Sequence, residues 1–260
     1  QALKYTLICL SCLQISLFSF ANSVDRIIKN GELVVGSDGS CLPYELRKPD
    51  SQWVGFEVDL MEAFARHLKV KLKFVDTSWD GLVPALVAKK FDMVASDLPI
   101  TEERKKFVLF THPYYKVQIG AVILNENKLK FTNKDITELN ENDLNIAVQM
   151  GTSASIMAKK YFPKANVIVY QNQDIASQSL LFKKVDVLYY EENYLKQFVK
   201  RNSTKVSFIS GRMGELYLAA AARKEDSELI DEFNKFYTEY KNSPEYKKSY
   251  TINFEVMPWI

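Results

Sequence analysis

The segment GFEVDLMEAFARHLKVKLKFV, residues 55–75, contains the two periodic patterns that decide the fold. Its first part repeats apolar residues at helical spacing and predicts a helix over residues 57–68. These apolar residues are Val58, Leu60, Met61, Phe64, Ala65 and Leu68. The second part, residues 70–75, alternates apolar and polar side chains as a half-buried strand does. Helices and strands that alternate along a chain indicate a sheet flanked by helices.

The same alternation continues on both sides of this segment and falls into two halves. The further strands are predicted at 33–36, 92–96, 119–124, 145–149, 167–170, 185–189 and 206–209, and the further helices at 82–89, 153–161, 175–183 and 227–250. A polar stretch, residues 126–142, separates the halves and is expected to run along the surface. We therefore expect an α/β protein of two lobes, with a cleft between them that suits a small molecule.

The charge balance and the cysteine count exclude several classes of function. The 260 residues include 34 Lys and Arg against 32 Asp and Glu, a net charge of +2, and the lysines are scattered, so we expect no nucleic-acid partner. Outside the first 21 residues the chain has one cysteine, Cys41, which cannot form an internal disulfide. With two histidines, His67 and His112, no zinc site can be assembled, and no cofactor is expected.

The first 21 residues have the pattern of a secretory signal peptide. Lys4 precedes the uncharged stretch 5–20, and Ser19 and Ala21 provide small residues where a signal peptidase reads, so cleavage is expected after Ala21. One alternative is an uncleaved membrane anchor, for which this stretch is shorter than the roughly 20 residues of a span. The other is a lipoprotein attached through Cys12.

Five motifs occur in the order and spacing of a known family. They are GFEVDL at 55–60, WDGLVPAL at 79–86, FDMVAS at 91–96 followed by ITEERK at 100–105, VQMGT at 148–152, and VDV at 185–187. Together they resemble the family 3 extracellular solute-binding proteins, the polar amino-acid binders of ABC importers. The resemblance covers nearly the whole chain after residue 21.

The resemblance implies a fold, a location and a role. The fold is the type II periplasmic-binding-protein fold, with two lobes, each a sheet flanked by helices, and two linker crossings. Lobe 1 would comprise residues 22–116 and 217–260, and lobe 2 residues 117–216. The protein would be a periplasmic monomer without enzymatic activity that closes by hinge motion on a free amino acid and delivers it to the membrane permease of an ABC importer.

A free amino acid needs a separate partner for its carboxylate. The planar fork of Arg104 can hold a carboxylate through two parallel hydrogen bonds, and the resemblance places it there because the Thr-x-x-Arg pattern is intact at 101–104. The alternative for Arg104 is a surface position in the charged run 102–106. From the other lobe, Thr152 and Ser153 begin a helix whose backbone N–H groups attract anions. Simple helix capping is the alternative for them.

The ammonium group and the side chain of the ligand need acids and a pocket wall. Glu191 stands where the family usually has an ammonium-binding Asp, and Glu192 is a competing assignment. The resemblance places Trp79 in the side-chain pocket, Asp38 at its distal end and Gln149 as an uncharged group from lobe 2. Asp38 could instead serve as a turn residue, and Trp79 as a core residue.

The sequence departs from the family pattern in two places that the resemblance puts at the cleft. Cys41 stands where many members have an aromatic ring, and Asp97-Leu98-Pro99 replaces a stretch that usually offers a small residue and a hydroxyl group. Ser96, which ends the matching FDMVAS motif, is also expected to line the site. Asp97 could bind the ammonium group directly. The three acids Asp38, Asp97 and Glu191 exceed what a zwitterion needs beside one arginine. This surplus favours a basic ligand such as arginine or lysine.

Two rival functions use the same fold. A cyclohexadienyl dehydratase-like lyase would need a general acid, and Glu191 or Asp97 could supply it; the run 77–79 is similar to that enzyme. A ligand-sensing domain would use the cleft to signal instead of feeding an importer. No nucleophile–base pair or phosphate-binding loop is evident in the sequence.

Overall fold

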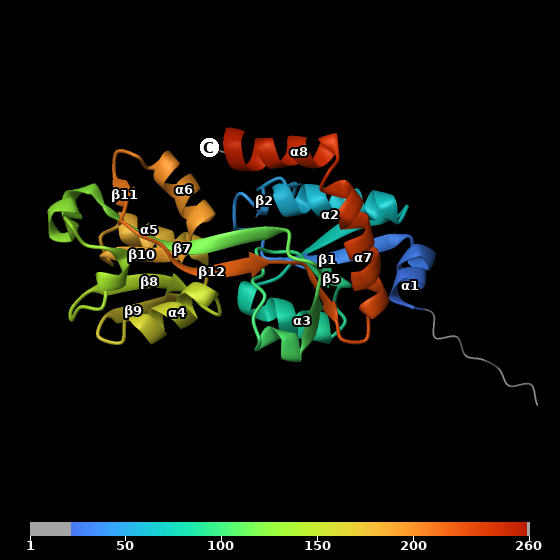
Figure 1. Cartoon of the computed structure of the whole chain (residues 1–260), viewed down its shortest axis with the longest axis horizontal. Coiled ribbons are helices and arrows are strands. Elements are labelled where there is room, and N and C mark those ends of the chain that lie inside the picture. Colours follow the sequence, from blue (N-terminus) through green and yellow to red (C-terminus); the bar gives the residue numbers. More distant parts are fainter. Residues whose placement is uncertain (1–21, 259–260) are drawn as a thin grey trace, which may run out of the picture.

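The computed structural model describes residues 22–258, which form two α/β lobes side by side (Figure 1). The predicted signal peptide, its cleavage after Ala21 and the lipidation alternative at Cys12 lie outside the described residues. None of the helices in residues 22–258 has the length and apolar character that crossing a membrane requires.

The first lobe is built on a sheet with the strand order β4-β1-β5-β13-β6. Its strands are β1 (Glu32–Ser37), β4 (Lys71–Asp76), β5 (Met93–Val94), β6 (Val108–Phe110) and β13 (Ala221–Arg223). β1 pairs in parallel with β4 and β5, whereas β13 is antiparallel to β5 and β6. The helices of this lobe are α1 (Ser23–Asn30), α2 (Phe56–His67), α3 (Leu82–Val87), α7 (Ser227–Tyr240) and α8 (Pro244–Tyr250).

The second lobe has the strand order β11-β7-β10-β8-β9, and β12 also pairs with β7. Its strands are β7 (Tyr115–Leu124), β8 (Asn145–Gln149), β9 (Asn166–Tyr170), β10 (Val187–Glu191), β11 (Val206–Phe208) and β12 (Met213–Leu218). The helices are α4 (Ser153–Tyr161), α5 (Gln173–Leu181) and α6 (Glu192–Arg201). Parallel strands β10, β8 and β9 end at the side of the sheet that faces the first lobe (Figure 1).

Two paired strands connect the lobes. β7 and β12 run antiparallel to one another, with Val117 opposite Leu216 and Tyr115 opposite Leu218. Leu218 is also tied to the first lobe, because it forms a bridge with Pro99 and its carbonyl accepts a hydrogen bond from the Tyr114 N–H at 3.0 Å. The lobe limits predicted at 116/117 and 216/217 fall inside this strand pair and remain a prediction.

The periodic segment 55–75 forms α2 and most of β4, so the predicted helix and strand are confirmed. The helix predicted over 227–250 is corrected to two helices, α7 and α8. Ser243 caps α8 by accepting a hydrogen bond from the Tyr246 N–H, and Pro244, which lacks an N–H, occupies its first turn. A π-helix, η5 (Thr251–Val256), follows.

The polar stretch 126–142 is also more ordered than predicted. It contains the 3₁₀-helices η3 (Asn125–Phe131) and η4 (Ile136–Glu138). Phe131, Ile136 and Leu139 are buried there, so the stretch covers part of the second lobe's core rather than running over its surface.

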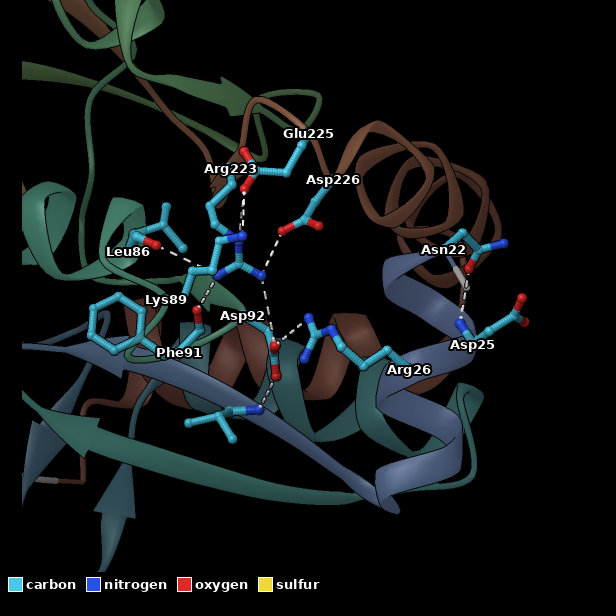
Figure 2. Close-up of polar contacts among 11 residues, drawn as sticks. Asn22, Asp25, Arg26, Leu86, Lys89, Phe91, Asp92, Arg223, Glu225 and Asp226 are labelled. Carbon is cyan, nitrogen blue, oxygen red and sulfur yellow. Dashed lines mark hydrogen bonds and ion pairs between the residues drawn. The ribbon is translucent and has the colours of Figure 1, made fainter. Parts of the chain in front are cut away.

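Far from the cleft, Arg223 ties together four segments of the first lobe (Figure 2). Its guanidinium, in a side chain that is 6% exposed, donates to the Phe91 carbonyl and pairs with Asp226 at 2.6 Å. Asp92 completes the network by accepting from Arg26 at 2.7 Å and from the Val34 N–H at 3.0 Å. These contacts join α1, β1, the segment before β5, β13 and the segment before α7 within the first lobe.

Candidate ligand-binding site

The two lobes touch directly across the cleft. Arg104 from the first lobe donates to the Gly151 carbonyl of the second at 3.2 Å. Asn193 Nδ2 donates to the Tyr44 hydroxyl at 2.9 Å, and this hydroxyl lies 3.4 Å from Glu191 Oε1. The structure is therefore a closed arrangement.

An inner cavity lies between the lobes. It is lined by Trp79, Asp97, Pro99, Ile119, Thr152, Ser153, Ala154, Tyr190, Glu191 and Leu216, and its volume is about 20 Å³. This is space for about one water molecule, so a larger molecule enters only if the lobes move apart. Six of the predicted site residues meet here: Trp79, Asp97, Pro99, Thr152, Ser153 and Glu191.

An outer pocket of about 420 Å³ adjoins the inner cavity at Trp79. It is lined by Asp38, Ser40, Ser78, Trp79, Asp80, Gln149, Met150, Gln171, Asn172 and Asp174. Three of these residues are carboxylates, and within the described chain no Lys, Arg or His lines this pocket. Its volume lies in the range of small-molecule sites.

Arg104 is held at the cleft by its own local turn. The Thr101 hydroxyl accepts a hydrogen bond from the Arg104 N–H at 3.1 Å, and η2 (Arg104–Lys106) begins at this point. Nη1 donates to the Pro99 carbonyl at 2.8 Å, and the guanidinium lies 5.6 Å from the centre of the Trp79 ring. Among residues 22–258 no carboxylate lies within 4 Å of it. The hydrogen bonds that position the guanidinium thus come from neutral carbonyl groups. Its positive charge forms no ion pair with a carboxylate of the described residues.

The start of α4 faces the cleft from the second lobe. The Thr152 hydroxyl caps the helix by accepting from the Ser155 N–H at 3.1 Å and donates to the Gln149 carbonyl at 2.8 Å. Capping is therefore one role of Thr152. The Ser153 hydroxyl is buried and has no hydrogen-bond partner in the described part of the chain. Together with the free N–H groups of the first turn, it leaves unpaired donors beside the inner cavity.

Glu191 is the acid of the second lobe that lines this cavity. It is 3% exposed and caps α6 by accepting from the N–H groups of Asn193 and Tyr194, each at 3.1 Å. Burial raises the pKa of Glu191 to about 7, although these backbone bonds lower it. Its competitor Glu192 instead pairs with Arg212 at 3.0 Å and with Lys196 at 3.3 Å. The geometry therefore favours Glu191 over Glu192.

Asp97 approaches from the first lobe. Its φ of 47° turns the chain sharply after β5, and the residue is 3% exposed. Oδ2 accepts from the Cys41 thiol at 3.2 Å, whereas Oδ1 has no partner among residues 22–258. Burial, and next the charge of Glu191, raise the pKa of Asp97 well above its usual value. Two acids from opposite lobes thus share one small cavity.

Asp38 and Gln149 belong to the outer pocket. Asp38 Oδ1 accepts from the Ser40 N–H at 3.1 Å, which is the turn role considered for it, and burial raises its pKa. Gln149 Oε1 accepts from the Tyr190 hydroxyl at 3.1 Å. Both side chains nevertheless line the pocket.

Cys41 and Ser96 lie behind the site rather than in its walls. The Cys41 thiol is occupied by Asp97. The Ser96 hydroxyl donates to Glu45 at 2.8 Å and accepts from the Asp38 N–H at 3.0 Å. Neither residue is among those that line the inner cavity or the outer pocket, and their hydrogen bonds support Asp97 and Asp38.

The prediction from sequence missed Tyr44, Asp80, Asp174 and Asn193. Asp174 lies in the first turn of α5 and Asn193 in the first turn of α6. The short polar run at each of these helix starts was the signal in the sequence that could have identified them. Tyr44 gave no local signal, because its partners are 147 and 149 residues away.

Comparisons with known proteins agree with this architecture. The profile of the bacterial extracellular solute-binding proteins, family 3, matches residues 33–255. A probable histidine-binding protein of Campylobacter jejuni is 34% identical over 216 residues, which are 80% of this chain and 79% of that protein. The L-arginine-binding protein of Pseudomonas aeruginosa is 29% identical and covers 82% of this chain, with 84% of its own length matched.

A solved structure extends the likeness to three dimensions. The crystal structure of the ancestral amino acid-binding protein AncCDT-1, a precursor of cyclohexadienyl dehydratase, superposes on this chain with a TM-score of 0.84 and 33% sequence identity. The superposition covers 90% of this chain and 100% of the AncCDT-1 chain. It confirms the two-lobed type II fold. All three proteins carry the name of a binding protein, which supports a solute-binding role over the lyase considered above.

Proposed function

Because the chain belongs to the bacterial extracellular solute-binding proteins of family 3, we propose that it binds a free L-amino acid with a cationic side chain and delivers it to the permease of an ABC importer. The proposed location is the periplasm, and the proposed state is a monomer. The observation that carries the choice of ligand is the distribution of charge in the cleft, where the Arg104 guanidinium, which pairs with no carboxylate among residues 22–258, faces a surplus of carboxyl groups.

The carboxylate of the ligand is assigned to Arg104 and the start of α4. The Arg104 fork has no carboxylate partner in the described chain, and the unpaired Ser153 hydroxyl lies with the free N–H groups of α4 beside the inner cavity. A ligand carboxylate between them would receive charge-assisted bonds from both lobes. Closure then follows from binding, since neither lobe alone supplies the full set of contacts.

The α-ammonium group is assigned to Asp97 and Glu191. An ammonium group donates three hydrogen bonds, and the free oxygen of Asp97 and the carboxylate of Glu191 both line the inner cavity. Burial disfavours the charged forms of both acids and raises the pKa of each. A positive group would allow both to ionise.

The outer pocket is assigned to a cationic side chain. Its walls contain the carboxylates of Asp38, Asp80 and Asp174, and the Trp79 ring offers a flat apolar face for an aliphatic stem. The relatives named for histidine and arginine carry ligands with a basic side chain. This agrees with the charge of the pocket.

Delivery to a permease is supported by a surface that needs both lobes. A groove of about 950 Å³ beside Arg104 is lined by Val87 and Phe107 of the first lobe and by Ile156 of the second. These apolar side chains are exposed. Since the groove is complete only in the closed protein, a permease could use it to distinguish the loaded from the empty form.

A thermal-shift screen of residues 22–260 against the twenty L-amino acids tests the function. A ligand at 100 times its Kd stabilises by about 2.7 kcal/mol, which for a chain of this size corresponds to a rise in Tm of about 5–10 °C. We expect arginine and lysine to give the largest rises. Citrulline, which has nearly the shape of arginine but no charge, is the matched control and is expected to give little. Equal shifts for arginine and citrulline would refute the cationic ligand, and no shift with any amino acid would refute the function.

Ligand affinity is expected to depend on pH through Glu191. A proton on Glu191 competes with the ligand ammonium, so Kd rises as the pH falls below the pKa of about 7, by up to about tenfold per pH unit. Asp97 has a raised pKa and adds an effect of the same sign. Isothermal titration calorimetry from pH 5.5 to 8.5 measures this slope. The Glu191→Gln variant is the control and should show weaker binding and a flatter slope; an unchanged Kd of the native protein over this range would contradict the assignment.

A further inference from the structure

The hydroxyl group of Tyr44 reaches from the first lobe to the second. It accepts a hydrogen bond from Asn193 Nδ2 at 2.9 Å and donates to Glu191 Oε1 at 3.4 Å. A phenolic hydroxyl has one proton to donate and can accept at its oxygen, so these contacts occupy it in both roles. Both partners belong to the second lobe, because Glu191 ends β10 and Asn193 lies in the first turn of α6.

The ring that carries this hydroxyl is held firmly on its own side of the cleft. Tyr44 is fully buried, and its ring packs edge-on against Tyr115 and Phe254, with centroids 5.8 and 5.7 Å away. Its N–H donates to the Cys41 carbonyl, and its carbonyl accepts from the Glu57 N–H, each at 2.9 Å. Because ring and backbone are both fixed, the hydroxyl cannot follow the second lobe when the lobes move apart.

Glu191 receives its hydrogen bonds from both lobes. Oε1 accepts from the Asn193 N–H at 3.1 Å as well as from the Tyr44 hydroxyl. Oε2 accepts from the N–H groups of Asn193 and Tyr194, each at 3.1 Å. Within the described chain, Tyr44 supplies the one donor to Glu191 that comes from the first lobe. This donor reaches the carboxyl group only while the lobes are together.

The contact between Tyr44 and Asn193 favours the closed arrangement by itself. It joins two protein groups and needs no group from a ligand, whereas the Arg104 fork is assigned to the ligand carboxylate. When the lobes separate, both groups must exchange this bond for water, and a hydrogen bond in the protein has a modest net advantage over that exchange. A larger closed fraction strengthens the apparent affinity in the same proportion, because the ligand then spends less of its binding energy on closure.

We propose that Tyr44 and Asn193 form a latch between the lobes, and that Tyr44 is a positioning residue that orients Glu191 from the opposite lobe and favours closure whether or not an amino acid is bound. The latch is the pair of side chains of Tyr44 and Asn193. The binding readout of this proposal rests on the function proposed above, whereas its distance readout does not.

Removal of the Tyr44 hydroxyl tests the latch through binding. Tyr44→Phe keeps the ring and its packing, and we expect Kd for the ligand found in the screen to rise by about threefold to tenfold. Most of this change should appear in the dissociation rate, since the latch breaks when the lobes open. Asn193→Ala, which keeps the N–H group that Glu191 accepts from, should have a similar effect.

The double variant and a matched control show whether the two side chains act as one contact. Tyr44→Phe combined with Asn193→Ala should bind about as weakly as the weaker single variant, because the second change finds the bond already broken. Tyr246→Phe is the control, since Tyr246 packs in the same aromatic cluster but lies on α8 of the first lobe; it should leave Kd unchanged. Effects that multiply, or an equal loss in Tyr246→Phe, would overturn the latch.

A distance measurement without ligand separates this proposal from the function. Spin labels at Lys159→Cys on α4 and Lys235→Cys on α7 lie on exposed positions of different lobes, and the native Cys41 is buried. Pulsed electron double resonance should show open and closed molecules, with a closed-to-open ratio that falls about threefold or more in Tyr44→Phe. An unchanged ratio, or no closed molecules in the protein with Tyr44 intact, would overturn the proposal. If no amino acid binds but the ratio falls, only the proposed function fails.

Discussion

Replacing Arg104 with alanine is expected to weaken ligand binding by about a hundredfold or more while the protein stays folded. The guanidinium carries no other carboxylate in the described chain, so its removal leaves the ligand carboxylate with the start of α4 alone. Truncating one partner of a buried charge pair costs about 2–5 kcal/mol, because the remaining charge stays desolvated without its partner. Isothermal titration calorimetry with arginine or lysine measures the loss.

Two further variants identify the origin of this effect. Arg104→Lys keeps the positive charge but loses the two-pronged geometry, so an intermediate loss is expected. Lys105→Ala is the matched control, because Lys105 lies in the same η2 turn, is half-exposed and pairs with Glu102. It should leave Kd unchanged. A Kd for Arg104→Ala within threefold of the native value would remove Arg104 from the site.

The contrast between α2 and α6 shows how far the sequence can predict this fold. α2 has twelve residues with a regular apolar stripe, so its period was visible. α6, with the sequence ENYLKQFVKR, buries Tyr194, Leu195 and Phe198, and apart from Val199 its other residues are polar or charged. No helix was therefore predicted over residues 192–201. Similarly, Ser243 and Pro244 are typical of the start of a helix. They lie inside the longer segment 227–250, which was predicted as one helix from its apolar spacing, so the start of α8 was missed.

The site divides in the same way between local and distant determinants. Arg104 could be predicted because the turn that holds it, from Thr101 to Arg104, is a local motif. Ser96 and Asp97 are neighbours with opposite orientations, since the positive φ of Asp97 turns one carboxyl group into the cavity while the Ser96 hydroxyl faces Glu45. Spacing along the chain cannot distinguish them. The Tyr44–Glu191 contact between the lobes has no sequence signal either, because only the closed fold brings the two together.

Gly55→Ala is expected to destabilise the first lobe by at least about 4 kcal/mol, among the largest effects of a single substitution. Gly55 precedes α2 with a φ of 131°, and a Cβ atom there would lie 2.2 Å from the Tyr44 carbonyl oxygen. That oxygen cannot move away easily, because it accepts a hydrogen bond from the Glu57 N–H at 2.9 Å. For a chain of this size the expected loss in Tm is about 10 °C or more, measured by circular dichroism.

Gly31→Ala is the control that separates backbone strain from this close approach. Gly31 also has a positive φ, 71°, but nothing lies within 4 Å of a Cβ placed there. Its substitution should cost about 1 kcal/mol from backbone conformation alone. Gly55→Ala should also weaken ligand binding, because the displaced segment carries Tyr44 and Glu45, whereas Gly31→Ala should not. If both variants lost the same stability and kept the same Kd, the packing of residues 43–45 against α2 would not determine the geometry of the site.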